Sequence, residues 1–406
     1  MFRHRKITFL LIASLALGGP AGATVCQTDL VPAATLLMPY FETSLVPTGL
    51  ESIFTVENSS AAPVALNAVV WSDFGIPVMG FPIALPARGS VSVSLHELLA
   101  EGKIPESDVS HFPLGQFPGC ANLLSQRTIP PTLLTQIQNA LTGQPGFQGL
   151  CYGSASPGIA RGYVTIDTVR DCTVNLPDTP AYFGRNGTGI ATNQNVLFGA
   201  GYLVDPSGPL SHSEPLVAIE ADGSKAELNT SGNYTFYARM VNWTARDNRE
   251  PLATDFGVRF QLDNPVAFTT DLFVWRDSRY KVAPFACSQS SRILIPDLPQ
   301  HLAAIGDSGV VYPISGSRLR LATQRLKVYS GSGDPGYGIP PDAGNFGWLF
   351  FNLNHARPVP GATINQRFQR AAQGWVFSVV TSSPYIGSSE AVRFDNACLP
   401  SVARKP

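Results

Sequence analysis

One segment of this chain occurs twice, and it constrains the fold more than any other feature. Residues 54–73 read FTVENSSAAPVALNAVVWSD, and residues 260–277 read FQLDNPVAFTTDLFVWRD. Each copy contains a Phe-led apolar stretch, an Asn, a Pro-Val-Ala step, a second apolar stretch and a final Trp-x-Asp. The copies differ in length between Phe and Trp, which predicts two strands joined by a variable loop. We interpret each copy as a β-hairpin.

Short apolar segments separated by turn residues fill most of the remaining chain, as is typical of β-sandwiches. Residues 256–262 alternate strictly between apolar and other side chains, which indicates a half-buried strand. No segment alternates strands with long helices. The sequence therefore predicts an all-β fold of two antiparallel β-sandwich domains. An apolar run, LLMPYF, precedes the first copy of the repeat. The other predicted strands are GYVTIDTV, NVLFGAGYLV, PLVAIEA, YTFYARMVNW, AFTTDLFVW, RILI, RLKVYS, FGWLFFNL, GWVFSVV and SEAVRF.

A small helical insertion separates the two predicted sandwiches. Pro131 begins an amphipathic segment in which Leu133, Ile137 and Leu141 recur at helical spacing, and Gly143 ends it. A shorter helix follows Ser94, because Ser94 and Glu97 have capping-box spacing. We predict a signal peptide at 1–23, an N-terminal sandwich at 24–115, a disulfide-stapled helical insertion at 116–160 and a C-terminal sandwich at 161–406.

The first residues have the features of an export signal. A basic start is followed by a short apolar run and by Ala21-Gly22-Ala23, which predicts cleavage after Ala23. The apolar run is too short to span a bilayer comfortably, so no membrane span is expected after cleavage. The net charge is −1 and charged residues make up 14% of the chain, which excludes a basic face for nucleic acid. The expected location is extracytoplasmic, either periplasmic or secreted.

All six cysteines follow the predicted cleavage site, and an even number in an exported chain indicates disulfides. The first predicted pair is Cys120 with Cys151, which bracket the helical insertion. Pairing Cys26 with Cys398 would join the two ends, and Cys172 would then pair with Cys287. Many other pairings are compatible with the sequence.

The known catalytic and cofactor motifs fail on inspection. Residues 306–309 read GDSG, as in serine proteases, but the flanking residues of that motif are missing, so a surface turn is expected. Residues 331–336 fit GxGxxG, but Pro335 and Pro340 exclude the helix that a dinucleotide site requires. The histidines are scattered without metal-ligand spacing. We predict no catalytic residue, no metal and no cofactor.

Two sets of residues are candidates for ligand binding. The polar cluster RDNRE, residues 246–250, follows a predicted strand and is either a binding loop or a solvated turn with internal ion pairs. The two Trp-x-Asp sequences are either core residues with turn caps or, if the tryptophans are exposed, surfaces that stack on sugars. The candidate residues are Trp71, Asp73, Arg246, Asp247, Arg249, Glu250, Trp275 and Asp277.

Several segments together resemble an uncharacterised group of exported bacterial proteins without an assigned activity. The resemblance implies export and a bacterial origin, and it transfers no functional residue. The segments are LLMPYFE, VVWSDFG, ARGYVTID, DNREPLATDFGVRF, TDLFVWRD and FGWLFFNL.

These observations favour an exported, non-enzymatic protein with a binding or structural role at the cell surface or outside the cell. The partner would be a glycan or another surface protein. The alternative is a secreted carbohydrate-active hydrolase that uses an Asp/Glu pair. Exposed aromatic side chains would favour glycan binding, whereas two close carboxylates in a cleft would favour the enzyme.

Overall fold

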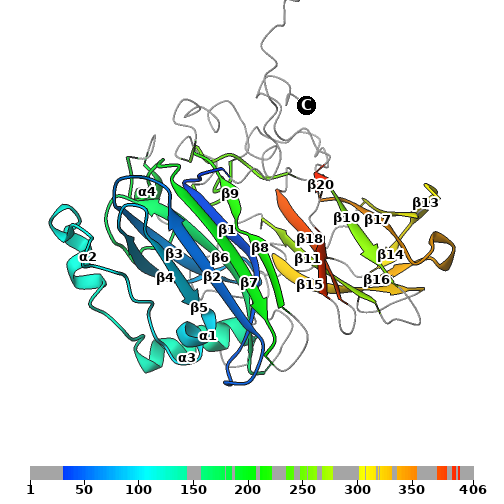
Figure 1. Cartoon of the computed structure of the whole chain (residues 1–406), viewed down its shortest axis with the longest axis horizontal. Coiled ribbons are helices and arrows are strands. Elements are labelled where there is room, and N and C mark those ends of the chain that lie inside the picture. Colours follow the sequence, from blue (N-terminus) through cyan, green and yellow to red (C-terminus); the bar gives the residue numbers. More distant parts are fainter. Residues whose placement is uncertain are drawn as a thin grey trace, which may run out of the picture.

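In the computed structural model, the strands of the described chain form four β-sheets, which make up two sandwiches side by side (Figure 1). This confirms the predicted all-β fold with two sandwiches. The described residues are 31–143, 157–178, 180–184, 188–206, 211–221, 235–241, 247–253, 255–262, 268–277, 301–306, 308–316, 319, 321–331, 336–353, 373–381, 386–389 and 392–393.

The N-terminal sandwich consists of an outer and an inner sheet. The outer N-terminal sheet has the order β5-β2-β7-β8 and contains β2 (Glu51–Asn58), β5 (Ser90–Ser94), β7 (Leu197–Val204) and β8 (Ser211–Pro215). The inner N-terminal sheet has the order β4-β3-β6-β1-β9 and contains β1 (Thr35–Ser44), β3 (Val64–Ser72), β4 (Pro77–Leu85), β6 (Ile159–Val169) and β9 (Val217–Ile219). Phe54 and Val56 of β2 share a core with Leu66 and Val70 of β3.

The inner N-terminal sheet is buried on both faces. Every residue of β3 is buried, and alternate side chains enter different clusters. Leu66 and Val70 face the outer N-terminal sheet, whereas Val69 and Trp71 belong to the cluster that continues into the C-terminal sandwich. A strand that is covered on both faces needs apolar side chains at nearly every position, which explains the run VALNAVVW.

The C-terminal sandwich also has an inner and an outer sheet. The inner C-terminal sheet has the order β14-β16-β15-β11-β18-β19 and contains β11 (Thr269–Arg276), β14 (Ser315–Gly316), β15 (Thr323–Ser330), β16 (Gly336–Ile339), β18 (Gly374–Thr381) and β19 (Ile386–Ser389). The outer C-terminal sheet has the order β13-β12-β17-β10-β20 and contains β10 (Asp255–Gln261), β12 (His301–Gly306), β13 (Val311–Pro313), β17 (Phe346–Asn352) and β20 (Val392–Arg393). The strands pair antiparallel, except that β15 and β16 pair parallel.

The two inner sheets pack against each other, and we call this contact the seam. The Tyr40 ring of β1 meets the Phe273 ring of β11 edge-on, with 5.0 Å between the ring centroids. The Thr323 hydroxyl donates a hydrogen bond to the Pro39 carbonyl at 2.6 Å, and the Ala322 amide donates one to the Asp73 carbonyl at 2.7 Å. One continuous apolar cluster therefore joins the two sandwiches.

The repeated segment forms an arch between sheets, so the hairpin prediction was wrong. β2 lies in an outer sheet and β3 in an inner sheet, and β10 and β11 are divided in the same way. The patterns of the two strands in the first copy explain this difference: β2 buries alternate residues, whereas β3 buries all of them. Two strands with such different surroundings belong to different layers, and the loop between them crosses the sandwich.

The similarity between the two halves extends beyond the arch. β2 lies between β5 and β7 and β3 between β4 and β6, while β10 lies between β17 and β20 and β11 between β15 and β18. Trp71 pairs with Tyr163 across β3 and β6, and Trp275 pairs with Trp375 across β11 and β18. Each of these partners follows a glycine, Gly162 or Gly374, and precedes a valine. The same six-strand pairing pattern is therefore used twice.

The helical predictions are confirmed where the structure describes them. The Ser94 side chain accepts a hydrogen bond from the Glu97 amide and caps α1 (Leu95–Leu99). α3 spans Pro131–Thr142 and ends at Gly143, whose φ of 66° lies in the left-handed region that favours glycine. The remaining short helices are η1 (Leu114–Gln116), α2 (Pro118–Leu123), α4 (Pro180–Phe183) and η5 (Pro341–Ala343).

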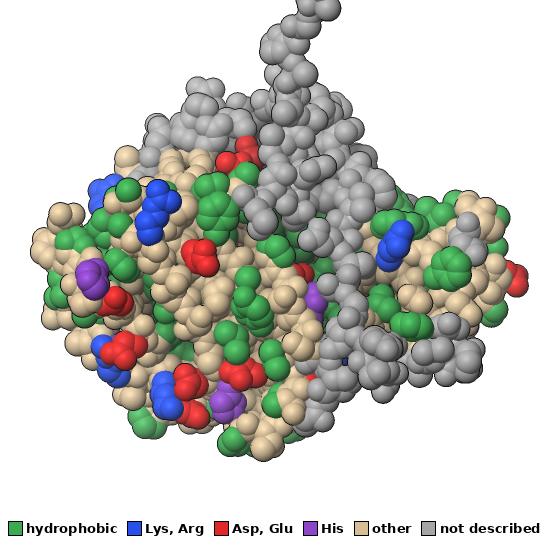
Figure 2. All heavy atoms as spheres, viewed as in Figure 1, with side chains coloured by type: hydrophobic (Ala, Val, Ile, Leu, Met, Phe, Trp, Pro, Cys, Tyr) green, Lys and Arg blue, Asp and Glu red, His purple; other side chains and the backbone are tan. Residues whose placement is uncertain are grey.

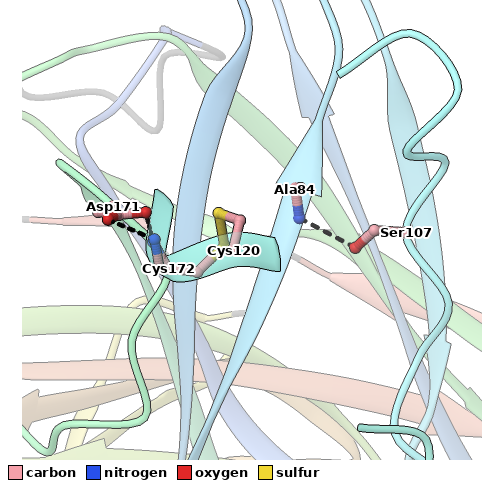
Figure 3. Close-up of a disulfide and its surroundings, with 6 residues drawn as sticks. Ala84, Ser107, Cys120, Asp171 and Cys172 are labelled. Carbon is pink, nitrogen blue, oxygen red and sulfur yellow. Dashed lines mark hydrogen bonds between the residues drawn. A yellow bond between two sulfur atoms is a disulfide. The ribbon is translucent and has the colours of Figure 1, made fainter. Parts of the chain in front are cut away.

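The disulfide in the described structure joins Cys120 to Cys172 (Figure 3). The predicted pairs of Cys120 with Cys151 and of Cys172 with Cys287 were therefore wrong. α2 packs beside the chain that leaves β6, where the Gly119 amide donates a hydrogen bond to the Asp171 carboxylate at 2.8 Å. Tertiary packing, rather than nearness in sequence, selects the pair. Cys26, Cys151, Cys287 and Cys398 lie outside the described residues, so the Cys26–Cys398 pair stays a prediction.

The sheets divide the chain elsewhere than at residue 161. β6, β7, β8 and β9 follow the predicted boundary, yet they pair with strands of the N-terminal sandwich, which therefore extends to Ile219. The strand predicted for YTFYARMVNW was also wrong, because residues 235–241 form turns. Of the GDSG residues, Ser308 lies in the predicted turn between β12 and β13, where the Gly309 amide donates to the Gly306 carbonyl at 2.9 Å, and Asp307 lies outside the described residues.

Candidate binding surface

The two Trp-x-Asp sequences meet at the seam. The Trp71 ring stacks on the Tyr163 ring at 5.3 Å, and the Tyr163 ring meets the Trp275 ring edge-on at 5.7 Å. Both tryptophans are buried, and the Trp71 indole nitrogen donates to the Thr165 hydroxyl at 2.8 Å. The sequence left open whether these tryptophans are core or exposed, and the structure shows that they are core residues.

Arg239 places a buried charge within this aromatic group. Its guanidinium donates to the Asp277 carboxylate and, at 3.3 Å, to the Tyr163 hydroxyl, and it lies 5.4 Å from the centroid of the Trp71 ring. The cavity that these side chains line has a volume of about 10 Å³, which is about the room for one water molecule. It is too small for a sugar or a cofactor.

Asp73 occupies the position of the first motif that corresponds to Asp277 in the second. It is buried, and among the described residues it has no ion-pair partner. Burial raises the pKa of the Asp73 carboxyl to about 8, although Arg161 and nearby backbone amides act in the opposite direction. Because Asp73 does not line the cavity at the seam, its raised pKa alone does not make it a general acid for a bound substrate.

The predicted polar loop contributes to the interior rather than to the surface. Arg249 is buried, and its guanidinium lies 3.5 Å from the Asp167 carboxylate and 3.7 Å from the Asp247 carboxylate. Asp167 also accepts a hydrogen bond from the Tyr182 hydroxyl at 2.8 Å. Burial raises the pKa of Asp247, against the attraction of Arg249. Glu250 is half-buried, and Arg246 lies outside the described residues.

A third charged group lies at a partly exposed edge of the seam. Arg161 and Arg325 both approach Glu42, at 2.8 and 3.5 Å, and Arg325 also lies 2.8 Å from Asp271. Burial raises the pKa of Glu42, but the attraction of Arg161 and its hydrogen bonds with Arg161 and Tyr40 outweigh this effect, so the pKa lies below its ordinary value. The arginines thus favour the anionic form of Glu42, as expected for a structural ion-pair network.

The described residues contain no cluster of three or more metal-ligating His, Cys, Asp or Glu side chains. Within the same part of the chain, no helix is both long enough and apolar enough to cross a membrane.

The outer C-terminal sheet presents a row of aromatic side chains away from its core. Along β17, Leu349 and Phe351 are fully buried, whereas the alternate residues Phe346, Trp348 and Phe350 point to the other face. Phe346 is 54% exposed, and the other two are half-buried. We call this row and its neighbours on β10, Gly257, Arg259 and Gln261, the outer aromatic face.

Arg259 gives the outer aromatic face a polar component. It pairs with Trp348 across β10 and β17, and its guanidinium lies 5.1 Å from the centroid of the Trp348 ring. On the other side of β17, Ile305 of β12 pairs with Trp348, and Val311 of β13 pairs with Ile305. Val311 is 62% exposed, so apolar surface continues to the edge strand.

The surfaces of the two sandwiches differ in character. On the face drawn in Figure 2, hydrophobic side chains occur on both lobes, whereas acidic, basic and histidine side chains are more numerous on the N-terminal sandwich and its helices than on the described part of the C-terminal lobe. Near the N-terminal helices, Lys103 pairs with Glu101 and Arg127 pairs with Glu106. The outer aromatic face is thus not a general property of this protein's surface.

Sequence reasoning missed both Arg239 and the outer aromatic face. Nothing in the local pattern around Arg239 indicates that it is buried at the seam. The segment FGWLFFNL was recognised only as a strand, although large apolar side chains on both faces of one strand are a signal. Such a strand is either covered on both faces or exposes a binding surface, and only the sheet order shows that β17 belongs to an outer sheet.

Comparison of this chain with models of known protein families, with curated proteins and with solved structures found no match. The resemblance to exported bacterial proteins therefore stays a prediction.

Proposed function

We propose that this protein is an exported, non-enzymatic binding protein, periplasmic or located at the cell surface, that binds its partner through the outer aromatic face. The signal sequence supports export, and the exposed Phe346 and Val311 side chains of the outer C-terminal sheet support binding. Contiguous exposed apolar surface on a folded protein is characteristic of interaction sites. A bacterial origin, as the resemblance implies, agrees with this location.

The observation that carries the proposal is a contrast within the molecule. β5 and β17 each pair with the first strand of an arch, β5 at the edge of its sheet and β17 between β10 and β12. The outward side chains of β5 are Ser90, Ser92 and Ser94, whereas those of β17 are aromatic. Pairing with the arch is compatible with small polar side chains, so this pairing alone does not require the aromatic side chains of β17. Binding of a partner would account for the aromatic side chains of β17.

The interior charges support binding over hydrolysis. A glycosidase acid needs a raised pKa beside the substrate, but Glu42 has a lowered pKa because Arg161 stabilises its charge. Asp73 has a raised pKa, but it does not line the small cavity at the seam. No observation among the described residues favours the hydrolase alternative.

The test is co-sedimentation of the mature protein with bacterial cell envelopes. A triple variant, Phe346→Ser with Trp348→Ser and Phe350→Ser, copies the outward residues of β5. The control is Val46→Ser on the N-terminal sandwich, because Val46 is 56% exposed and Phe346 is 54% exposed. We expect the wild type and the control to sediment and the folded triple variant to stay in solution.

Two results would contradict the proposal. Equal sedimentation of the triple variant and the wild type would place the binding surface elsewhere, and failure of the wild type to sediment would remove the binding role. Release of reducing sugar by the wild type would instead support the hydrolase. Circular dichroism checks that all variants are folded.

A further inference from the structure

We infer that the aromatic group at the seam is a binding cage for a guanidinium cation, which the chain between the two sandwiches fills with its own Arg239. The occupied cage joins the two inner sheets through one buried side chain. This inference does not depend on the outer aromatic face, because the cage lies between the inner sheets. We call it the seam cage, and its members are Trp71, Tyr163, Trp275, Asp277 and the Gly75 carbonyl.

Both sandwiches contribute to the seam cage. Trp71 of β3 and Tyr163 of β6 belong to the N-terminal sandwich. Trp275 belongs to β11 of the C-terminal sandwich, and Asp277 follows that strand. The Tyr163 ring contacts both indoles, stacked on Trp71 and edge-on to Trp275. A side chain that binds groups on both sides of the seam therefore ties the two sandwiches together.

The acceptors around Arg239 match the planar arrangement of N–H groups in a guanidinium. Its Nε donates to the Asp277 carboxylate, and one Nη donates to the Gly75 carbonyl at 3.2 Å and to the Tyr163 hydroxyl at 3.3 Å. The guanidinium carbon lies 5.4 Å from the centroid of the Trp71 ring, within the range of a cation–π contact. A guanidinium has five N–H donors in one plane and flat faces that stack, whereas an ammonium is a compact charge. The seam cage is therefore expected to select a guanidinium over an ammonium.

One carboxylate balances the charge in the seam cage. Asp277 and Arg239 are both buried and form an ion pair, and a buried cation requires a partner of opposite charge. Asp73 holds the corresponding position in the first copy of the repeat, but it does not line this cavity. The space that remains beside Arg239 is about 10 Å³, so the guanidinium nearly fills the cage. The cage thus has the charge and the volume for one guanidinium.

The position of Arg239 in the chain makes the occupied cage a clamp. Residues 235–241 form turns in the connection between β9 of the N-terminal sandwich and β10 of the C-terminal sandwich. The Tyr237 hydroxyl in these turns donates to the Asp167 carboxylate of β6 at 3.0 Å. The connection is therefore anchored to the N-terminal sandwich by Tyr237 and to the C-terminal sandwich by the ion pair of Arg239 with Asp277.

The first experiment is chemical rescue of Arg239→Ala. Ethylguanidinium has the atoms of the arginine side chain that this variant removes, so it should enter the cage that the variant leaves. We expect Arg239→Ala to melt below the wild type and millimolar ethylguanidinium to raise its melting temperature by about 1–3 °C. The wild type should not respond, because its own Arg239 occupies the cage. Ethylammonium lacks the planar fork and ethylurea lacks the charge, so neither should raise the melting temperature.

Three results of this experiment would overturn the inference. The first is no rise with ethylguanidinium, and the second is an equal rise with ethylammonium or ethylurea. The third is an equal rise in the wild type, which would place the binding site of ethylguanidinium outside the seam cage.

Arg259→Ala is the matched control. The Arg259 guanidinium also lies over a tryptophan, 5.1 Å from the centroid of the Trp348 ring, but it is exposed on the outer aromatic face. Ethylguanidinium should leave the melting temperature of this variant unchanged. Arg239→Ala combined with Asp277→Asn lacks the carboxylate of the cage, and rescue should be lost. Rescue that persists without the carboxylate, or that occurs equally in Arg259→Ala, would overturn the inference.

A second set of measurements covers variants that do not fold alone. For these, the refolding yield with each compound replaces the melting temperature. A yield for Arg239→Ala that ethylguanidinium alone restores supports the seam cage, and a yield that it does not restore contradicts it. Arg239→Lys keeps the positive charge but loses the planar fork, so it should melt below the wild type. Equal melting temperatures of Arg239→Lys and the wild type would overturn the selection of a guanidinium.

Discussion

On β5 of the N-terminal sandwich the outward side chains are hydroxyls, whereas on the corresponding β17 they are the aromatic rings of Phe346, Trp348 and Phe350. Both strands flank the first strand of an arch and bury the alternate residues in a core. Because the pairing pattern is shared, strand pairing does not explain why the outward residues of β5 and β17 differ. The outward residues of β17 therefore form an apolar row that the sandwich does not require.

The same comparison applies at the seam, where the two Trp-x-Asp sequences meet. Asp277 is paired with Arg239, whereas Asp73 is buried without an ion-pair partner among the described residues. The two motifs therefore place the same residue types beside different partners. Similar sequence in the two halves predicts similar topology, but it does not predict the same ion pairs.

The largest expected difference between the sandwiches concerns the disulfide. The bond between Cys120 and Cys172 closes a sequence separation of 52 residues in the N-terminal sandwich, and loop-closure entropy gives it about 4 kcal/mol of stabilisation. Replacing both cysteines by alanine should lower the free energy of unfolding by that order, measured by urea denaturation. Because one apolar cluster spans the seam, we expect a single transition. Two separate transitions would show that the sandwiches unfold independently.

The paired glycines test whether the two halves are structurally equivalent. A Cβ atom on Gly162 would lie 1.9 Å from the Trp71 carbonyl oxygen, whereas one on Gly374 would lie 3.1 Å from the Trp275 carbonyl and 2.5 Å from a Leu353 methyl. Gly162→Ala should lower the free energy of unfolding by about 3 kcal/mol and Gly374→Ala by about 1–2 kcal/mol, because backbone atoms move aside less readily than a side chain. Thermal unfolding of both variants measures these losses. Equal losses in the two variants would contradict the expected difference between Gly162 and Gly374.

The stability of the fold should depend on pH through Asp73. The folded-state pKa of Asp73 is about 8, above its ordinary value of 3.8, so the folded protein binds more protons between these limits. The contribution of Asp73 to stability is therefore complete at acidic pH and falls by about 1.4 kcal/mol per pH unit as the pH rises towards 8. Asp73→Asn should flatten this dependence in urea titrations at several pH values. Asp277→Asn should also destabilise the fold, because it removes the carboxylate that pairs with the buried Arg239. An unchanged slope in Asp73→Asn would contradict the assignment.

The smallest expected effect concerns Phe346. Because this side chain is 54% exposed, Phe346→Ser should change the free energy of unfolding by no more than about 0.5 kcal/mol. Phe351→Ser on the buried face of the same strand should cost several times more, about 3 kcal/mol. Chemical denaturation of the two variants tests the separation of fold from surface on β17. A large loss in Phe346→Ser would make the aromatic row part of the fold.

Several elements of the structure follow from local physical chemistry and were predicted from sequence. The alternation of residues 256–262 predicted β10, the Ser94 cap predicted α1, and the Pro131 start with the Gly143 end predicted α3. The wrong predictions have a common cause, which is contact between residues that lie far apart in the chain. Residues 235–241 are apolar enough for a strand, but they form turns because Tyr237 and Arg239 have partners at the seam.

Sequence alone indicated the all-β class, the repeated unit and the positions of most described strands, because these depend on periodicity and on residues within one turn or strand. Tertiary structure decided that the repeat is an arch, that Cys120 meets Cys172 and that Trp71 and Trp275 are core residues. It also decided that β17 lies in an outer sheet, which exposes its aromatic row. These outcomes depend on which layers lie beside a strand, and layer order arises from contacts between residues far apart in the chain.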